Sequence, residues 1–221
     1  MDNRQVEGFN RIVFCGPGLL DVYQHDTESL SIDAPRYVLP NIESTVVDGT
    51  LKLGLKRTRV VDIGMYKEIV AYVVTLRDLT DLVVRGTGKV LIPDLDQDHV
   101  RFELSGNGSI TVHELTADTI ESRVNGSGMV KLAGDIEHQS IDLHGAAVYS
   151  ASDLVSDSAN VNVTGIGTVG VSVNQLLSAR IIGAGTVTYS GYPEVDKQIV
   201  GKGAVRRRRD RNDTKRGKQN V

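Results

Sequence analysis

Among its 221 residues the chain has only one cysteine, five prolines and no tryptophan. With Cys15 alone, no internal disulfide can form, and we expect this residue to be a small buried strand residue. No stretch approaches the ~20 apolar residues that a membrane-spanning helix needs. The opening sequence MDNRQVEGFN lacks the basic-then-apolar pattern of a secretory leader, so no signal peptide is visible.

Glycine, in contrast, is abundant, and it recurs at near-constant intervals. There are 23 glycines without a three-residue period, which excludes a collagen-like chain. Gly-x-Gly pairs recur every 20, 20, 19, 20, 18 and 18 residues when the degraded copy Gly145-Ala-Ala147 is counted. The pairs are Gly86/Gly88, Gly106/Gly108, Gly126/Gly128, Gly165/Gly167, Gly183/Gly185 and Gly201/Gly203. Apolar and polar residues alternate around each pair, which is the period of a strand with one buried face.

A unit of 18 to 20 residues cannot bury its own apolar face, but stacked units can. We therefore predict an all-β fold, a parallel β-helix or β-solenoid of about seven 18–20-residue Gly-x-Gly rungs with an irregular β N-terminal part. At ~4.8 Å between paired strands, seven rungs form a column about 30 Å tall. The predicted rungs begin near Leu79, His99, Thr119, Gln139, Ser158, Leu176 and Glu194.

Residues 9–78 lack the glycine period but still have the pattern of strands. We expect strands at 11–15, 19–24, 29–33, 42–47, 50–55 and 69–76. The pair Asp48-Gly49 predicts a tight hairpin between two of them. The predicted organisation is a single domain over 9–205, with a capping part at 9–78, regular rungs at 79–205 and a disordered basic tail at 206–221.

Three stretches resemble a known family: FNRIVFCGPGLLDVYQ (9–24), VLPNIESTVVDGTLKLGL (38–55) and GAGTVTYSGYPEVDKQIVGKGAV (183–205). Together with the L-x-x-x-Gly-x-Gly-x-Val units between them, they resemble the putative auto-transporter adhesin head GIN domain family over roughly 9–205. The resemblance implies a bacterial protein with a β-helix-like fold, located in the cell envelope or outside the cell, and it carries no catalytic motif. The chain departs from the family pattern in its missing leader, the degraded rung at Ala147 and the basic tail.

The glycine pairs and the histidines are candidates for chemical sites. A dinucleotide-binding loop requires a helix after the glycines, whereas each pair here leads into another strand. In 138-HQSIDLH-144, the alternation turns Asp142 and His144 to solvent, so neither a zinc site nor a triad with Ser140 is supported. We nominate no catalytic, cofactor-binding or metal-binding residue and no cofactor, and expect a protein that is not an enzyme.

Acidic residues recur at equivalent rung positions. Neighbouring rungs bring such residues to ~4.8 Å, where two exposed carboxylates repel by about 0.9 kcal/mol in water. This permits two interpretations, a solvated acidic face or a site for a cation such as calcium. The two predicted ladders are Asp98, Asp118, His138 and Asp157, and Asp94, Glu114 and Asp153.

Charge is unevenly distributed along the chain. Residues 206–221 hold eight basic and two acidic side chains, a net charge of +6, whereas residues 1–205 hold 17 basic and 26 acidic, a net charge of −9. The tail could contact phosphates or anionic lipid, or it could be a solvated terminus that keeps other chains from pairing with the last rung. The tail has no interleaved aromatic residues and the body is acidic, so nucleic acid is not an expected partner.

The first functional hypothesis is a non-enzymatic cell-envelope or secreted binding or adhesion module, with glycans or other cell-surface components as partners. It rests on the resemblance and on the shape of a solenoid. One alternative is a carbohydrate-active β-helix enzyme, to which the carboxylates at Asp94/Glu114 and Asp98/Asp118 point. The other is a purely structural scaffold. The ligand and the oligomeric state do not follow from the sequence.

Overall fold

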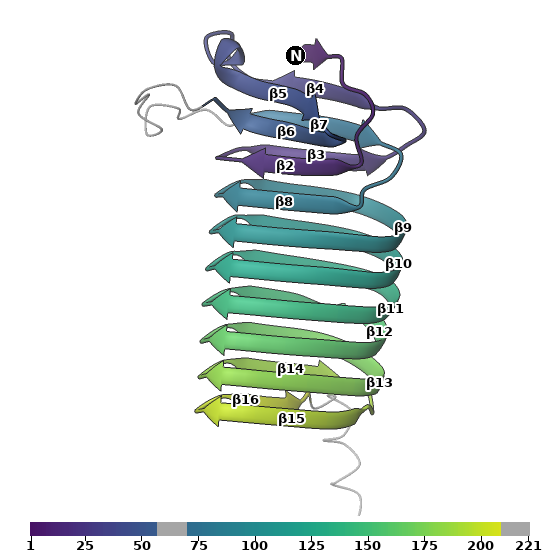
Figure 1. Cartoon of the computed structure of the whole chain (residues 1–221), viewed down its shortest axis with the longest axis vertical. Coiled ribbons are helices and arrows are strands. Elements are labelled where there is room, and N and C mark those ends of the chain that lie inside the picture. The colour runs from purple at the N-terminus through teal and green to yellow at the C-terminus, as the bar shows by residue number, and fades with distance from the viewer. Residues whose placement is uncertain (57–69, 209–221) are drawn as a thin grey trace, which may run out of the picture.

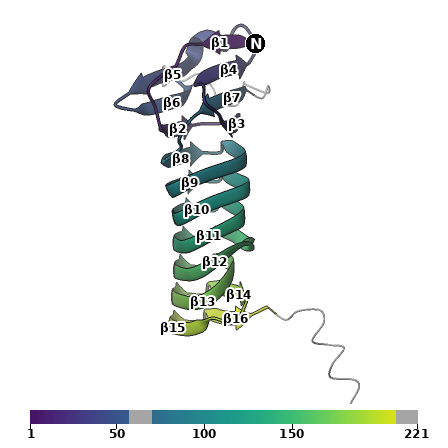
Figure 2. The same cartoon turned by 90° about the vertical axis from the view of Figure 1, so that its right-hand side faces the viewer.

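The protein is a column of stacked β-strands, seen from two sides in Figures 1 and 2. The computed structural model describes residues 1–56 and 70–208, and the strands among them form one 16-stranded sheet. The regular part consists of long parallel strands that each bend once and pass from one flank of the column to the other. These strands are β9 (Lys89–Gly106), β10 (Ser109–Gly126), β11 (Met129–Gly145), β12 (Val148–Gly165) and β13 (Thr168–Gly183).

The predicted solenoid is confirmed, but it has about six turns rather than seven. The units at the two ends of the repeat are incomplete: β8 (Asp81–Gly86) lies above β9 on one flank only, and β16 (Ala204–Arg207) starts a turn that is not finished. The turn that follows β13 is divided into β14 (Thr186–Ser190) and β15 (Glu194–Gly201), and we call β15 and β16 together the last turn. The prediction of seven rungs was based on the number of glycine corners, so each incomplete end unit was counted as a whole rung.

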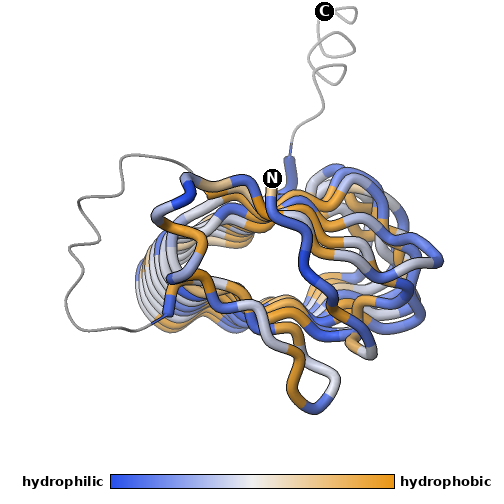
Figure 3. Tube along the Cα trace, turned by 90° about the horizontal axis from the view of Figure 1, so that it is seen from above, coloured by the Kyte–Doolittle hydropathy of each residue, from blue (hydrophilic) through white to orange (hydrophobic). Residues whose placement is uncertain are grey.

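The core is a set of apolar columns inside the turns. The residue two positions before each first glycine is buried from Val84 to Ile181, and the residue four positions after it is buried from Val90 to Val187. Burial fails only in the last turn, where Ile199 is 38 % exposed and Val205 is half-buried. Figure 3 looks down the column and shows the turns superposed, so that equivalent positions lie above one another.

Glycine suits the corner for two different reasons, although Ala147 occupies the second position in one turn. Gly126 has φ +120°, and a Cβ there would lie 2.6 Å from the carbonyl oxygen of Gly106. The second glycine of the pair, Gly128, has no positive φ, but a Cβ would lie 2.6 Å from a methyl group of Leu104 and 2.7 Å from the carbonyl oxygen of Gly108. The first glycine thus provides the bend and the second provides close packing.

At the N-terminal end the strands are shorter and partly antiparallel. The predicted strands match the structure closely; position 69 lies outside the described residues, and the sequence did not indicate the first strand. The elements are β1 (Asp2–Arg4), β2 (Arg11–Cys15), β3 (Leu19–Gln24), β4 (Ser29–Asp33), a 3₁₀ turn (Leu39–Asn41), β5 (Ile42–Val47), β6 (Thr50–Leu55) and β7 (Ala71–Leu76).

The order of stacking at this end differs from the order of the chain. Strand β2 lies between β6 and β8, and β3 lies between β7 and β9, all in parallel. Residues 11–24 are therefore a turn of the column inserted beneath later residues. Above them β4 pairs antiparallel with β7 and with β1, and β5 pairs antiparallel with β6. The predicted hairpin is present, with positive φ at both Asp48 and Gly49.

The C-terminal end has no such cover among the described residues. β16 runs two residues beyond the expected boundary at Val205, and Arg208 N–H donates to the carbonyl oxygen of Tyr189. In this last turn Lys197 lies beneath the buried Ala179, and Arg207 beneath Tyr189. Two cations thus occupy positions that hold core residues in the turns above. The rest of the predicted tail, from 209, lies outside the described residues.

Candidate functional site

The bends of the long strands form an acidic edge, at the right of Figure 1 and facing the viewer in Figure 2. We call residues 93–99, 113–119, 133–138 and 152–158 the acidic bend; it contains nine Asp and Glu residues and no Lys or Arg. Asp94 lies opposite Glu114 as predicted, but Asp153 lies opposite Ala133 of the strand between them. This predicted ladder is therefore interrupted.

The other predicted ladder contains one wrong residue. Thr119 lies opposite His138, not Gln139, because β11 has one residue fewer at the bend: Val112 pairs with Leu132 but Leu115 with Gly134. Counting from the pairs Thr119–His138 and His138–Ser158 places Glu137, rather than His138, between two aspartates of the column. The corrected ladder is Asp98, Asp118, Glu137 and Asp157, four carboxylates in succession.

The acidic bend does not have the geometry of a metal site. Within residues 1–56 and 70–208, no three His, Cys, Asp or Glu side chains converge closely enough to hold a metal ion. The carboxylates of the corrected ladder are exposed apart from the half-buried Asp157. Water screens their repulsion, which makes the ladder tolerable as a solvated surface.

Two histidines make the same contact in different turns. The Nδ1 atom of His99 lies 2.6 Å from Thr119 Oγ1, and that of His138 lies 2.8 Å from Ser158 Oγ. Since Thr119 lies opposite His99, and Ser158 opposite His138, both contacts join neighbouring rungs along one column. The contact recurs two rungs further along the same column, so it is a feature of the repeat rather than of one turn.

The predicted orientation of the histidine segment is confirmed. Asp142 is half-buried on the outer surface and His144 is exposed. Asp142 contacts two neighbouring rungs: it accepts a hydrogen bond from Asn162 Nδ2 at 3.0 Å and lies 3.8 Å from Arg123 Nε. Its carboxylate therefore pairs with an amide and a guanidinium.

A shallow groove of about 450 Å³ crosses β10 to β13 on the flank that follows the bend. We call this surface the groove flank. This groove is not predictable from the sequence, because short polar residues on an outer face give no signal of a hollow. Its floor is the inward column of Ile120, Gln139 and Ala159. Two outer columns border it, Thr119, His138, Ser158 and Leu176, and Glu121, Ser140, Asn160 and Ser178.

A polar residue interrupts the apolar core beneath this groove. Gln139 is 2 % exposed, its Nε2 donates to Ser156 Oγ at 2.7 Å, and that hydroxyl donates to the carbonyl oxygen of Ser172 at 3.0 Å. No described protein atom pairs with Gln139 Oε1. Nearby, Ser122 Oγ donates to Tyr149 Oη at 3.5 Å. Burial raises the pKa of Tyr149 above its ordinary value, and this hydrogen bond offsets only part of the increase.

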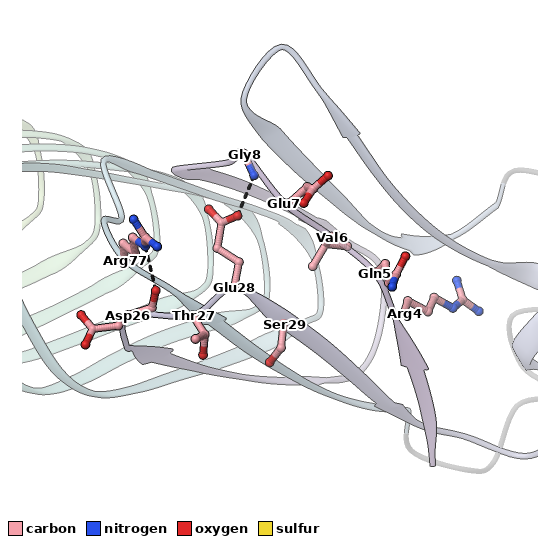
Figure 4. Close-up of a pocket in the computed structure, with 10 residues that line it drawn as sticks. All are labelled: Arg4, Gln5, Val6, Glu7, Gly8, Asp26, Thr27, Glu28, Ser29 and Arg77. Carbon is pink, nitrogen blue, oxygen red and sulfur yellow. Dashed lines mark hydrogen bonds between the residues drawn. The ribbon is translucent and has the colours of Figure 1, made fainter.

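A larger open cleft, of about 1170 Å³, lies at the N-terminal end (Figure 4). Its polar groups already serve the fold. The Glu28 carboxylate accepts hydrogen bonds from the backbone N–H groups of Gly8, at 2.6 Å, and Phe9, at 3.4 Å. Arg77 Nε donates to the carbonyl oxygen of Asp26 at 2.7 Å. The cleft is therefore better explained as the seam that ties the N-terminal segment to the column than as a binding site.

The remaining candidates have structural explanations. Each glycine pair is followed by a strand, as expected for a corner rather than for a phosphate-binding loop. Cys15, expected to be buried, is half-buried at the end of β2. Among the described residues, no helix has the length and apolar character needed to cross a membrane.

Residues 8–193 match the family described as "Putative auto-transporter adhesin, head GIN domain". The chain belongs to this family. No functionally curated protein is significantly similar to it. Among solved structures, a putative adhesin from Bacteroides fragilis is 25 % identical with a TM-score of 0.83, over 93 % of this chain and 94 % of that one.

Two further structures of this head GIN domain protein's fold come from Parabacteroides. A putative adhesin from Parabacteroides merdae is 21 % identical with a TM-score of 0.75, over 94 % of this chain and 95 % of that one. A putative lipid binding protein from Parabacteroides distasonis is 20 % identical with a TM-score of 0.74, over 94 % and 96 %. At these identities the likeness shows the fold. The relatives come from bacteria, and the names of the putative adhesins are consistent with an adhesion module. They identify no ligand for this chain.

Proposed function

We propose that this protein is a non-enzymatic adhesion module of the bacterial cell envelope that holds an extended glycan along the groove flank. Membership of the head GIN domain family and structural neighbours named putative adhesins support the general role. The observation that carries the ligand class is the groove itself, which crosses four successive strands rather than lying in one turn.

The chemistry of the groove suits a polymer rich in hydroxyl groups. Its outer columns offer the hydroxyls of Thr119, Ser140 and Ser158, the amide of Asn160 and the imidazole of His138. These groups donate and accept hydrogen bonds, and they recur at ~4.8 Å along the column. A chain of sugars lying along the column meets a similar set of partners at every turn. A compact ligand would use only one turn.

The first experiment is to locate the protein in its own cells by fractionation and by protease treatment of intact cells. The proposal expects cleavage on intact cells. A protein that stays in the cytoplasm, protected from protease, contradicts it.

The second experiment measures binding to a panel of soluble cell-surface glycans. The variant His138→Ala/Asn160→Ala removes two groove partners and should weaken saturable binding at least about tenfold, since each lost hydrogen bond contributes roughly 1 kcal/mol. The control Thr111→Ala/Ser150→Ala removes two hydroxyls from the other flank and should bind as the parent does. Absence of saturable binding across the panel, or equal loss in both variants, counts against the groove.

Two other functions give different results in the same preparations. The four-carboxylate ladder favours a carbohydrate-active enzyme as second candidate. Release of reducing ends or of unsaturated products from polyuronides or neutral glycans, abolished by Asp118→Asn/Glu137→Gln, would replace the binding proposal with that enzyme. Concentration-dependent assembly in the absence of any glycan, without binding, would favour a structural scaffold.

A further inference from the structure

The last turn of the column carries a cluster of positive charge. Five cations lie in β15, β16 and the residues beside them, against two acidic residues, Glu194 and Asp196, and all seven are exposed. We call the cations Lys197, Lys202, Arg206, Arg207 and Arg208 the basic end. The sequence beyond it adds five basic and two acidic residues, whereas residues 1–193 have a net charge of −9. The molecule is thus strongly polarised along its long axis.

Apolar groups lie among these cations. Both are in or beside the last turn: Tyr192 is 80 % exposed and Val200 is 55 % exposed. The Arg207 guanidinium lies 3.6 Å above the centre of the Tyr192 ring. Exposed aromatic and aliphatic groups beside Lys and Arg are typical of surfaces that lie at a lipid–water boundary, where rings sit at the headgroups and cations meet phosphates.

The basic end is also the lowest part of the column among residues 70–208. Among the described residues nothing pairs with β15 except β13, or with β16 except β14, so the lower edges of both strands face outward (Figure 1). Lys197 and Arg207 occupy inward positions there, which opposes stacking of a further apolar turn. Charge of either sign would be enough to protect the edge from pairing with another chain. The excess of cations and the exposed ring are not explained by protection alone.

We propose that the basic end docks this protein end-on onto an anionic phospholipid bilayer. Charge complementarity carries the proposal: the cations attract anionic headgroups, and the acidic bend along the column is repelled by the same surface. Docking by the end therefore keeps the bend and the groove flank away from the lipid. The proposal does not rest on the glycan-binding role, because vesicles of phospholipid contain no glycan.

The test is sedimentation of the full chain with vesicles of phosphatidylglycerol and phosphatidylcholine, compared with phosphatidylcholine alone. The variant Lys202→Gln/Arg206→Gln/Arg208→Gln should bind the anionic vesicles about 100-fold more weakly, since each basic side chain near such a surface contributes roughly fivefold. The control Arg85→Gln/Lys89→Gln/Lys131→Gln removes three exposed cations elsewhere on the column and should leave binding nearly unchanged. Equal loss in both variants overturns the proposal.

A second variant separates the basic end from the sequence beyond it. Replacing Arg209, Arg211, Lys215, Arg216 and Lys218 with Gln in the full chain should weaken vesicle binding without abolishing it. If this variant loses all binding while Lys202→Gln/Arg206→Gln/Arg208→Gln keeps it, the end face is not the docking surface. Binding to single-stranded DNA or heparin without binding to anionic vesicles also overturns the proposal, in favour of another polyanion.

Orientation has its own readout, because the chain contains no tryptophan. Tyr192→Trp places a single indole at the basic end, and Tyr37→Trp places it in the loop between β4 and β5 at the other end, where the tyrosine is 62 % exposed. On anionic vesicles the indole emission of the Tyr192→Trp variant should shift to the blue and be quenched by spin-labelled lipid, while that of the Tyr37→Trp variant should not change. Equal responses at both ends would mean side-on or non-specific association and would contradict end-on docking.

Discussion

At its N-terminal end the column is closed by antiparallel strands and an apolar interior, whereas at its C-terminal end the described residues finish in one incomplete turn with charges at inward positions. Above β8, residues such as Phe14 and Leu51 are fully buried, and β1, β4 and β5 cover the top turn. Below β13, Ile199 is 38 % exposed and Lys197 continues the column of Ala179. The two ends solve the same problem, an exposed pairing edge, in different ways.

The difference shows what a repeat specifies and what it does not. A rung in the middle of the column is stabilised by equivalent rungs on both sides, so the same short pattern works at each level. An end has a neighbour on one side only and needs residues that depart from the pattern. The closed end uses additional strands for this, and the open end, within the part of the chain that the structure describes, uses charge.

The largest expected difference between the two ends is in how much a core substitution lowers the free energy of unfolding. Phe14 is fully buried, and its ring packs edge-to-face on Tyr72 with centroids 5.4 Å apart. Phe14→Ala should lower the free energy of unfolding by about 3–5 kcal/mol in urea titrations, and Ile199→Ala at the open end by less than about 1 kcal/mol. Equal losses would mean that the open end is as well packed as the closed one.

A smaller difference is expected between two glycines with the same geometry. Gly126 and Gly201 have φ +120° and +119°, and a Cβ would lie 2.6 Å and 2.3 Å from the carbonyl oxygen of the glycine in the turn above. Gly126→Ala in mid-column should cost about 2–3 kcal/mol, because turns on both sides hold the strained backbone in place. Gly201→Ala should cost less than about 1 kcal/mol, because the last turn can detach locally.

Hydrogen exchange distinguishes these two responses. In Gly201→Ala the amides of β15 should exchange faster while those of β10 to β12 keep their protection, whereas Gly126→Ala should accelerate exchange along the column. Protection that falls everywhere in Gly201→Ala would show that the last turn is cooperative with the rest.

A third prediction concerns charge at the open end. Lys197→Leu replaces an inward cation with the kind of residue that the turns above place there, so it should create an apolar edge and cause self-association. Lys202→Leu, in the glycine corner of the same turn, is the matched control and should stay dispersed. Sedimentation velocity over a wide concentration range gives the answer; if neither variant associates, the inward charge does not protect the edge.

Most of the fold follows from the sequence because it repeats. Glycine spacing predicts the rungs and alternation predicts their inward residues, while hairpin and turn signals locate the N-terminal strands. The sequence could not show that residues 11–24 stack beneath β6 and β7, because stacking order depends on contacts between distant segments. The register of β11 was also missed at the bend, since a rung one residue shorter can lose that residue anywhere along its length.

The candidate sites were less predictable than the fold. The acidic bend can be predicted from the composition of the rungs, although the prediction placed His138 in the ladder where the structure has Glu137. The groove flank was missed, since it is formed by short side chains from separate turns. Gln139 was missed for a different reason: it occupies an inward position where alternation predicts an apolar residue, and its pairing with Ser156 depends on a neighbouring turn.

The smallest effect is expected at Tyr72, whose hydroxyl is buried without a partner among the described residues. Burial raises the pKa of Tyr72 to about 12, although Arg4 lowers it. Below pH ~10 the phenol is neutral in both the folded and unfolded chains, so Tyr72→Phe should leave the free energy of unfolding nearly unchanged, because it removes a hydroxyl that has no partner among the described residues.

Between about pH 10 and 12 the unfolded phenol ionises while the folded one stays protonated, so the parent loses up to about 1.4 kcal/mol per pH unit from this group. Tyr72→Phe should remove that slope and leave the rest of the alkaline transition in place. Tyr149→Phe in mid-column should also remove a slope, because burial raises the pKa of Tyr149 as well, but it leaves the Ser122 hydroxyl unpaired and should cost about 1 kcal/mol at neutral pH. Urea titrations at pH 7 and across the alkaline range measure both effects. A neutral-pH cost for Tyr72→Phe as large as that for Tyr149→Phe would show that the Tyr72 hydroxyl has a partner at the closed end.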